Sequence, residues 1–495
     1  MTDTTTVPPS PSHSTGGSGP GADVLHLVVA WCGEQPHRVG ESAVFPDLNL
    51  EYTFGRGPGD GRQLRVEFAP RSPHARVAPT CLDAPSVSRD HLLFVPRSIG
   101  LEVKHLGGAP MRIAGEPATE GLLAPGQTIL LEDRLLLLVT RGPAVLEARH
   151  FPPGLRGAFG QVDRFGMVGE SPRFWRLLDT LAFAGRSREH VLLLGATGTG
   201  KESAARTVHL LSDRAGRPYV AHNAAGVPPA LAEAELFGNV KDYPNPPMPE
   251  RPGLLGEASG GTLLLDELGE LPQEIQAKLL RVLDDAGQYR RLGEGFARRA
   301  DVRVIGATNR PVERFRGDLF ARLKQRAELP RLRDRPEDIP LLAQHRLRVL
   351  LEHFPEVAAR VVERRADGFV HVRIAVELVD ALLGAEHPLN VRGLDTILLK
   401  AIEQSRGSTV RASPEELAAL RPVPEERRAG LVSPSGRVRE LTPAELETLR
   451  RMIDGRHGCV TAAARALKLS RYQVYRLMER HGLTGLSGED PDDDR

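Results

Sequence analysis

Eight consecutive residues decide the fold of the central region: Gly195, Ala196, Thr197, Gly198, Thr199, Gly200, Lys201 and Glu202. They follow an apolar run, residues 191–194, and precede a helix-like segment, residues 203–211. In a strand–turn–helix unit of this kind, glycines let backbone N–H groups face a phosphate, and the helix N-terminus adds partial positive charge. Lys201 reaches the outer phosphates, while Glu202 stands where serine or threonine is usual. The pattern predicts an α/β domain that binds a nucleoside triphosphate.

A second apolar run, residues 262–265, ends in two carboxylates, Asp266 and Glu267. An acid at the end of a strand that faces a phosphate loop can hold Mg²⁺, either directly or through water. We expect Asp266 to do this and Glu267 to orient or deprotonate the attacking water. The alternative is that the pair only caps the helix expected near Pro272. Together with the upstream loop, the carboxylates favour an ATPase with ATP and Mg²⁺ as its cofactors.

The bulk properties are those of a soluble protein of about three domains. The 495 residues carry a formal net charge of +1. Cys32, Cys81 and Cys459 are far apart and fit neither a zinc spacing nor a disulfide framework, which favours a reducing compartment. Apolar runs such as residues 135–139 are far shorter than the ~18 residues of a membrane span. The N-terminus lacks a basic segment followed by an apolar one. We therefore expect a cytoplasmic protein without membrane attachment.

Changes in composition and periodicity divide the chain. Short apolar runs alternate with turn residues in the N-terminal third, as in a β-sandwich, and strands then alternate with helices in the central region. We expect a disordered arm at 1–23, an all-β sandwich at 24–142, an α/β ATPase core at 163–345, its helical lid at 346–411, a linker at 412–438, an all-α unit at 439–486 and an acidic tail at 487–495.

The central region carries further motifs around the phosphate loop. Residues 168–172, VGESP, precede the loop, and a Lys-Glu pair ends it. With these motifs the region resembles the AAA+ domain of bacterial enhancer-binding proteins, the activators of sigma-54 RNA polymerase. The resemblance implies further residues of an ATP site: Asn223 as a gate for Glu267, Thr308 and Asn309 as the first sensor, and Arg392 as the second sensor on the helical lid.

Two arginines, Arg316 and Arg322, stand where this family supplies arginine fingers to a neighbouring subunit. A cation inserted across a subunit boundary stabilises charge on the transferring phosphoryl group, so hydrolysis then depends on ring assembly. Taken alone, either arginine is an ordinary surface or salt-bridged residue. The resemblance implies a homo-oligomeric ring, a hexamer or heptamer.

One loop departs from the family pattern. Where the family carries GAFTGA, the loop that grips sigma-54, residues 242–247 read DYPNPP. Proline fixes φ and removes N–H donors, so we expect a stiffer loop. Tyr243 is displaced by one position from the family phenylalanine, and Gly393 replaces the glutamate that follows the second sensor. ATP binding is therefore expected, and engagement of sigma-54 is left open.

The C-terminal unit resembles the Fis-type helix-turn-helix. Residues 461–467 and 471–481 read as two helices, with Ser470 as a plausible N-cap of the second. Residues 439–486 carry nine Lys or Arg and five Asp or Glu, a net charge of +4 that favours a polyanion. The alternative is an ordinary helical hairpin with a basic face. The resemblance implies binding of double-stranded DNA by Arg471, Tyr472, Gln473, Tyr475, Arg476 and Arg480.

The N-terminal sandwich resembles a forkhead-associated domain, a module that binds phosphothreonine peptides through its loops. Residues 88–91, SRDH, match the family pattern S-R-x-H, whereas the family Asn-Gly is not recognisable in residues 106–110. The resemblance implies that Arg56, Ser88 and Arg89 bind the phosphate through charge-assisted hydrogen bonds. We expect His91 to brace the loop. The alternative is a scaffold that has lost its ligand.

Together these observations predict a multidomain protein with an N-terminal all-β sandwich, a central α/β P-loop AAA+ ATPase with an α-helical lid, and a C-terminal all-α helix-turn-helix. The expected function is a sigma-54-dependent-type transcriptional regulator that hydrolyses ATP, binds DNA and senses phosphothreonine. One rival is a DNA-binding regulator that has lost sigma-54 remodelling and uses ATP only for assembly. Another is a phosphopeptide-binding scaffold.

Overall fold

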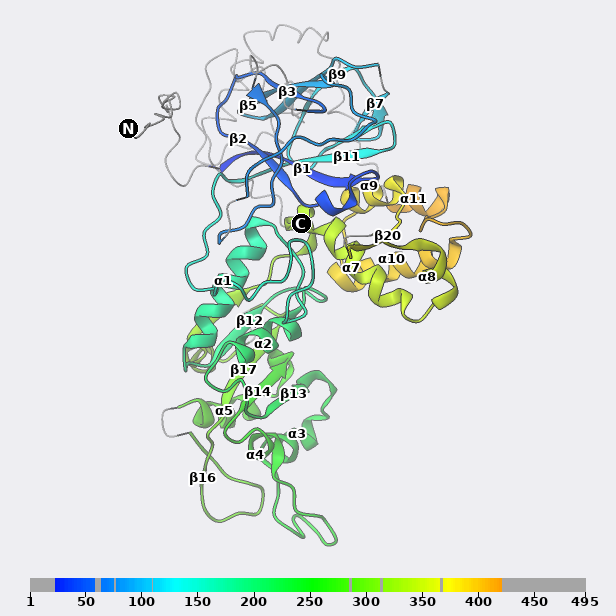
Figure 1. The fold of residues 1–495 in the computed structure, drawn as a ribbon. Coiled ribbons are helices and arrows are strands. Elements are labelled where there is room, and N and C mark those ends of the chain that lie inside the picture. The colour runs from blue at the N-terminus through cyan, green and yellow to red at the C-terminus, as the bar shows by residue number, and fades with distance from the viewer. Residues whose placement is uncertain are drawn as a thin grey trace, which may run out of the picture.

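The computed structural model describes residues 23–57, 64–74, 77–108, 110–284, 287–311, 315–365 and 368–420. These residues form a β-sandwich, a parallel α/β core and a helical layer beside both (Figure 1). The expected helix-turn-helix with its DNA-binding residues, the acidic tail, nearly all of the N-terminal arm and most of the linker lie outside the described residues. The described start of the predicted linker, residues 412–420, differs from the expectation because it contains the helix Pro414–Leu420. Among the helices that the structure describes, none is long and apolar enough to cross a membrane.

The sandwich consists of two antiparallel-rich sheets. The first has the strand order β2-β1-β11-β10-β7-β8 and the second β4-β3-β5-β6-β9. Alternating residues of the long strands, such as Leu25 and Leu27 of β1 or Leu135 and Leu137 of β11, point into the core that both sheets share. The bounds are β1 (Asp23–Cys32), β2 (Ser42–Phe45), β3 (Tyr52–Phe54), β4 (Leu64–Arg65), β5 (Leu92–Arg97), β6 (Gly100–His105), β7 (Met111–Ile113), β8 (Glu116–Pro117), β9 (Glu120–Leu123), β10 (Thr128–Leu131) and β11 (Leu135–Pro143).

The central region is a five-stranded parallel sheet with the order β13-β14-β17-β12-β18. Its three inner strands, β14, β17 and β12, are buried along nearly their whole length because helices cover both faces. Val191 and Leu193 of β12 pack in the cluster that α1 and α2 cover, whereas Leu192 packs in the cluster under α3 and α5. The strands are β12 (Val191–Leu194), β13 (Tyr219–Asn223), β14 (Thr262–Asp266), β17 (Arg303–Thr308) and β18 (Gln325–Glu328); the helices are α1 (Pro172–Arg186), α2 (Lys201–Leu210), α3 (Pro229–Phe237), α4 (Gly253–Glu257), α5 (Gln273–Leu283) and α6 (Gly317–Arg322).

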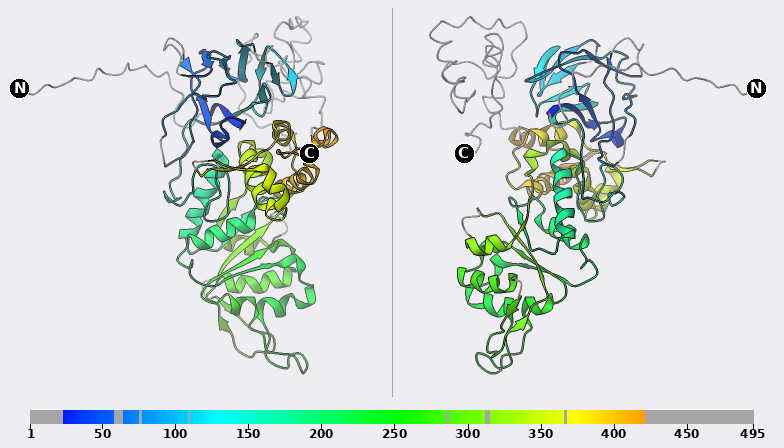
Figure 2. Two further views of the ribbon diagram at one scale, coloured as in Figure 1. Left: turned by 45° about the vertical axis from the view of Figure 1, so that its right-hand side comes forward. Right: turned by 90° about the vertical axis from the view of Figure 1, so that its left-hand side faces the viewer.

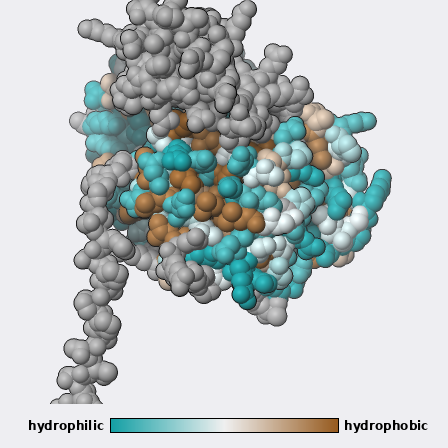
Figure 3. Space-filling model, turned by 90° about the horizontal axis from the view of Figure 1, so that it is seen from above, coloured by the Kyte–Doolittle hydropathy of each residue, from teal (hydrophilic) through white to brown (hydrophobic). Residues whose placement is uncertain are grey.

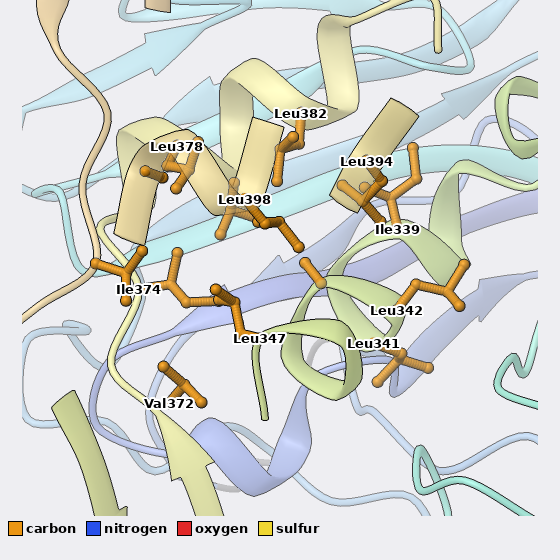
Figure 4. Close-up of a cluster of buried hydrophobic side chains, with 14 of the residues drawn as sticks. Ile339, Leu341, Leu342, Leu347, Val372, Ile374, Leu378, Leu382, Leu394 and Leu398 are labelled. Carbon is orange, nitrogen blue, oxygen red and sulfur yellow. The ribbon is translucent and has the colours of Figure 1, made fainter. Parts of the chain in front are cut away.

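The helical layer follows the last core strand. It contains α7 (Ile339–Leu351), α8 (Pro355–Val361), α9 (Val376–Gly384), α10 (Asn390–Gln404) and α11 (Pro414–Leu420), with a small hairpin of β19 (Val362–Arg364) and β20 (Val370–Val372). Leucines and isoleucines from α7, α9 and α10 point toward one another in one buried cluster (Figure 4).

The first sheet of the sandwich packs its outer face on this helical layer. Val28, Leu130, Leu136 and Leu138, which point away from the sandwich core, belong to the same buried cluster as the leucines of α7, α9 and α10. The two further views also show the sandwich directly against these helices (Figure 2). Both faces of the sheet are thus buried, which explains why residues 135–139 are apolar without alternation.

Two polar contacts fix this junction. The Trp31 indole N–H donates to the Ile374 carbonyl at 3.0 Å. The Thr128 hydroxyl donates to an Asp380 carboxylate oxygen at 2.7 Å, and both side chains are buried. Buried polar groups of this kind are costly unless they are paired, so the two bonds define one docking geometry.

Candidate nucleotide-binding site

The predicted strand–turn–helix unit is present at residues 191–210, where β12 leads through the phosphate loop, residues 195–200, into α2. Gly198 and Gly200 have φ values of 77° and 99°, in the left-handed region that favours glycine. The Thr199 hydroxyl donates to the Ala196 carbonyl at 2.8 Å and closes the loop. The start of α2 faces the loop, so its free N–H groups and partial positive charge lie at the same place.

Lys201 is the first residue of α2 and is 7% exposed. Its ammonium group donates to the Gly195 carbonyl at 3.0 Å and lies 3.8 Å from a Glu267 carboxylate oxygen. Glu202 follows in the first turn of α2 and is exposed. The buried Lys201 ammonium group therefore lies directly beside Glu267, one of the two predicted carboxylates.

Asp266 and Glu267 lie at the carboxyl end of β14, beside the phosphate loop. Asp266 is paired in register with Asn223 of β13. Glu267 has φ 53°, an unusual value for a residue with a side chain, and its backbone N–H donates to an Asp266 carboxylate oxygen at 3.0 Å. Backbone strain of this kind is concentrated at functional sites, where the surrounding structure holds a side chain in place.

The predicted first sensor, Thr308 and Asn309, also meets this edge. The Thr308 carbonyl accepts from Gly195 N at 3.2 Å, and the Asn309 amide donates to the Thr197 hydroxyl at 3.1 Å. Asn309 N lies 3.4 Å from a carboxylate oxygen of Glu267. The end of β17 thus contacts both the phosphate loop and the carboxylate pair.

Asn223 lies at the carboxyl end of β13, in register with Asp266. Its side-chain oxygen accepts from Ala225 N at 2.9 Å and caps the short turn that follows β13. Within the described residues, no hydrogen bond joins Asn223 to Glu267; the charged neighbour of Glu267 is Lys201 instead. The gate therefore stays a prediction.

The helical layer reaches the phosphate loop through the start of α10. The Val391 N–H donates to the Gly198 carbonyl at 3.1 Å. A Cβ added to Gly198 would lie 3.3 Å from Cβ of Arg392, so the predicted second sensor stands next to the loop. Asn390, which the sequence analysis did not assign to the site, donates to the Thr197 carbonyl at 2.9 Å. In the sequence, only its position two residues before Arg392, at the start of a helix, could have assigned Asn390 to the site.

Arg316 and Arg322 lie away from this edge, on the surface around α6. Arg316 pairs with Asp318 at 2.8 Å, and Arg322 pairs with Asp284 at 2.9 Å. The two side chains are 39% and 46% exposed. The described ion-pair partners of both arginines are acidic residues of the same surface.

Two segments project from the core on the side away from the sandwich (Figure 1). We call them the tip: residues 239–251, between α3 and α4, and residues 288–299, which contain β15 (Gln288–Tyr289) and β16 (Arg298–Arg299). Asp242 N donates to the Met248 carbonyl at 2.8 Å within the first segment. The Tyr243 ring covers Gly293 of the second segment so closely that a Cβ there would lie 2.6 Å from it.

Ion pairs reinforce the contact between the two tip segments. Arg291 bonds Glu250 at 2.6 Å and Glu294 at 3.0 Å. Hydrogen bonds from Arg298 and Arg291 lower the pKa of Glu294 to about 2. The proline-rich loop is thus held against residues 288–299 by these ion pairs and by the Tyr243 ring.

The loops of the sandwich bring Arg56, Ser88 and Arg89 to one exposed end of the second sheet. Arg56 N donates to the Ser88 carbonyl at 2.8 Å, and Ser88 N donates to Nδ1 of the buried His91 at 3.0 Å. Burial and the neighbouring His105 lower the pKa of His91, which keeps Nδ1 available as an acceptor. His91 thus braces the loop, as expected.

Arg65 is a further residue of this end that the sequence analysis missed. Its guanidinium bonds Asp90 at 2.7 Å and the Arg89 and Gly57 carbonyls at 2.8 and 2.9 Å. Seen from above, the upper face of the molecule mixes apolar and polar residues (Figure 3). This end belongs to the sheet whose described residues do not pack on the helical layer.

Comparison with known proteins gives matches over the core and beyond it. The family described as Sigma-54 interaction domain matches residues 167–327. The anaerobic nitric oxide reductase transcription regulator NorR of Escherichia coli is 35% identical over 424 residues, which are 79% of this chain and 80% of NorR. The transcriptional regulatory protein ZraR of Salmonella typhimurium is 36% identical over 326 residues, 64% of this chain and 69% of ZraR.

Other relatives match over a smaller share of their length. The transcriptional regulatory protein XylR of Pseudomonas putida is 41% identical over 256 residues, and the chain covers 43% of it. The match takes up 50% of this chain. Among solved structures, NtrX of Brucella abortus in complex with ATP is 30% identical, with 64% of this chain and 69% of that chain covered and a TM-score of 0.43.

Proposed function

Because this chain belongs to the family of AAA+ transcriptional regulators that carry a sigma-54 interaction domain, we propose that it binds and hydrolyses ATP between the subunits of a ring and regulates transcription from DNA. One observation carries the proposal. The phosphate loop, Lys201, the Asp266–Glu267 pair and the first sensor meet at a single edge of the parallel sheet. Ligands of α/β proteins bind at this edge of the sheet.

The residues at this edge suit a magnesium–triphosphate complex. Mg²⁺ prefers carboxylate oxygens, and the Asp266 carboxylate would hold such a cation. When bound, the cation would neutralise charge on the phosphates. Lys201 would move from the Gly195 carbonyl to the outer phosphates, which frees Glu267 to orient or deprotonate the attacking water.

The exposed arginines Arg316 and Arg322 complete the site from the next subunit in this proposal. Their ion pairs with Asp318 and Asp284 are surface pairs, which contribute little stability and exchange readily for a phosphate. A subunit alone would then hydrolyse ATP slowly, and assembly into a homo-oligomeric ring would raise the rate.

In this proposal the sandwich receives the regulatory signal, and the C-terminal unit binds the protein to DNA. Arg56, Ser88 and Arg89 form an exposed, Arg65-braced end of the sandwich that suits a phosphothreonine peptide. DNA binding is assigned to the C-terminal residues from Arg471 to Arg480, on the strength of their sequence alone. Phosphopeptide binding would control ring assembly or activity near a promoter.

One observation favours a second candidate, a regulator that uses ATP for assembly but does not remodel sigma-54. The tip segment that stands in place of GAFTGA is proline-rich, and Tyr243 and Arg291 fasten it to residues 288–299. A loop fastened in this way has less freedom to move during hydrolysis than a small glycine-rich loop.

The test is open-complex formation by the full-length protein with sigma-54 RNA polymerase on a premelted promoter. Wild type is compared with Glu267→Gln, which should bind ATP without hydrolysing it, and with Asp266→Ala. We expect opening that needs hydrolysable ATP and is lost in both variants. Hydrolysis without opening would select the second candidate. Hydrolysis by Asp266→Ala at the wild-type rate would refute the assignment of the site.

A further inference from the structure

Asn390 joins three segments that are far apart in the sequence. Its side-chain oxygen accepts from Leu332 N at 2.7 Å, and its side-chain N–H₂ donates to the Thr197 carbonyl at 2.9 Å. The residue is 3% exposed. The amide thus uses both of its ends, one on the segment that follows β18 and the other on the phosphate loop.

The backbone around Asn390 suits asparagine in particular. Its φ is 50°, in the left-handed region where asparagine is one of the few tolerated residues with a side chain. Asn390 N donates to the His387 carbonyl at 2.8 Å and holds this turn at the start of α10. A side chain with a different amide reach could not satisfy both partners from this backbone position.

The contact joins the helical layer to the phosphate loop. Next to the Asn390 bond, Val391 N donates to the Gly198 carbonyl at 3.1 Å. The Leu389 carbonyl lies so close to Gly198 that an added Cβ would be 2.2 Å from it. Thr197 and Gly198 are therefore held between α2 and the start of α10, with Arg392 beside them.

We propose that Asn390 is a positioning residue for nucleotide binding, which holds the Thr197–Gly198 turn of the phosphate loop in its phosphate-accepting conformation from the helical layer. The inference rests on the proposed ATP site. In this role Asn390 does not contact the phosphates. It holds in place the backbone N–H groups of the phosphate loop that contact them, so less conformational entropy is lost when the nucleotide binds. The same contact ties Arg392 to the loop.

The test compares Asn390→Gly with Gln344→Ala in the full-length protein. Glycine keeps the left-handed backbone and removes both side-chain bonds without adding charge. Gln344 is a matched control because its amide also makes two bonds, to Val372 N and O at 3.0 and 2.8 Å, within the helical layer. Calorimetric titration measures Kd for ATP and ADP, and hydrogen exchange measures opening of residues 195–201 without nucleotide.

We expect both variants to melt at a lower temperature than wild type. Only Asn390→Gly should raise the Kd values for ATP and ADP and the hydrogen exchange of the loop amides, each about tenfold. Should Asn390→Gly fail to fold, Asn390→Asp keeps the acceptor for Leu332 N, lacks the donor to Thr197, and should show the same exchange. Wild-type Kd values and exchange in the folded variant would overturn the inference. A wild-type protein that binds neither nucleotide would refute the ATP site, while the exchange result would still decide the role of Asn390.

Discussion

At the phosphate-binding edge of the core, the loop is tied to β17 through Thr308 and Asn309 and to the helical layer through Asn390. At the tip, residues 239–251 are tied chiefly to one neighbouring segment, residues 288–299. A change at the edge therefore disturbs several elements, whereas a change at the tip stays local. The residues of the tip can therefore change with little effect on the proposed ATP site.

The largest expected effect tests whether an arginine of one subunit completes the ATP site at the edge of the next subunit. Lys201→Ala should abolish ATP binding, and Arg316→Ala or Arg322→Ala should slow hydrolysis by about a thousandfold, since an arginine finger contributes at least that factor. Mixing the lysine variant with the responsible arginine variant should restore hydrolysis, because some interfaces then combine an intact Lys201 with an intact arginine. The measurement is steady-state phosphate release.

The control for this mixing experiment is Arg97→Ala. Arg97 is 41% exposed and pairs with Glu102 at 2.7 Å, much like the two candidate fingers, but it lies on the sandwich. Its replacement should leave the rate within twofold of wild type. If mixed subunits stay as inactive as the separate variants, the arginines do not act in trans and the edge is a site within one subunit.

A second test concerns the fastening of the tip. Tyr243→Ala removes the ring that covers Gly293, and should raise hydrogen exchange at the Asp242 amide about tenfold, which corresponds to about 1.4 kcal/mol of local opening free energy. ATP hydrolysis should change by less than twofold. Phe296→Ala, which removes another aromatic ring of the tip that is 61% exposed, is the control and should leave this amide unchanged. A matching fall in hydrolysis after Tyr243→Ala would show that the tip and the edge are coupled.

The smallest expected effect concerns neither the edge nor the tip. It is the pH dependence of stability that the buried His26 of the sandwich causes. His26 is buried, donates to the Gly142 carbonyl at 3.1 Å and faces Arg71. Burial, and then the Arg71 charge, lower the pKa of His26 to about 3 from its ordinary 6.5. The folded state therefore binds fewer protons than the unfolded state between these values, and the free energy of unfolding falls as the pH drops below 6.5.

At pH 5.5 the loss from His26 amounts to about 1.4 kcal/mol. His26→Gln keeps a donor for Gly142 and does not titrate, so between pH 7.5 and 5.5 it should lose about 1.4 kcal/mol less than wild type in urea denaturation. The exposed His353→Gln is the control and should retain the wild-type difference. Equal losses in wild type and His26→Gln would contradict a neutral, buried His26.

The sequence predicted what local patterns specify. The phosphate loop, the strand that ends in Asp266 and the strand that ends in Thr308 each carry a short apolar run followed by polar residues, so their type followed from the local pattern. The place of Thr308 at the same edge followed only from the family resemblance. Asn390 could not be assigned in this way because its partner Thr197 is 193 positions away. The orientation of Asn223 depends on the turn after β13, which its motif does not specify.

The docking of the sandwich was also beyond the sequence. Short apolar runs between turn residues identified β1 and β11 as strands, but no local pattern says what covers the outer face of a sheet. The uninterrupted leucines at 135–138 were the one sign that both faces are buried. The partner surface on α7 and α9 is only defined once the chain has folded.

The shared cluster of the sandwich and the helical layer limits how such chains can recombine. A gene fusion joined between residues 143 and 167 would separate Val28, Leu136 and Leu138 from the leucines of α7 and α10. Each of these side chains stabilises the fold by about 1.5–3 kcal/mol through burial, so both halves would expose an adhesive apolar surface. The sandwich in this chain therefore depends on the helices against which it packs, and it cannot be exchanged as an independent domain.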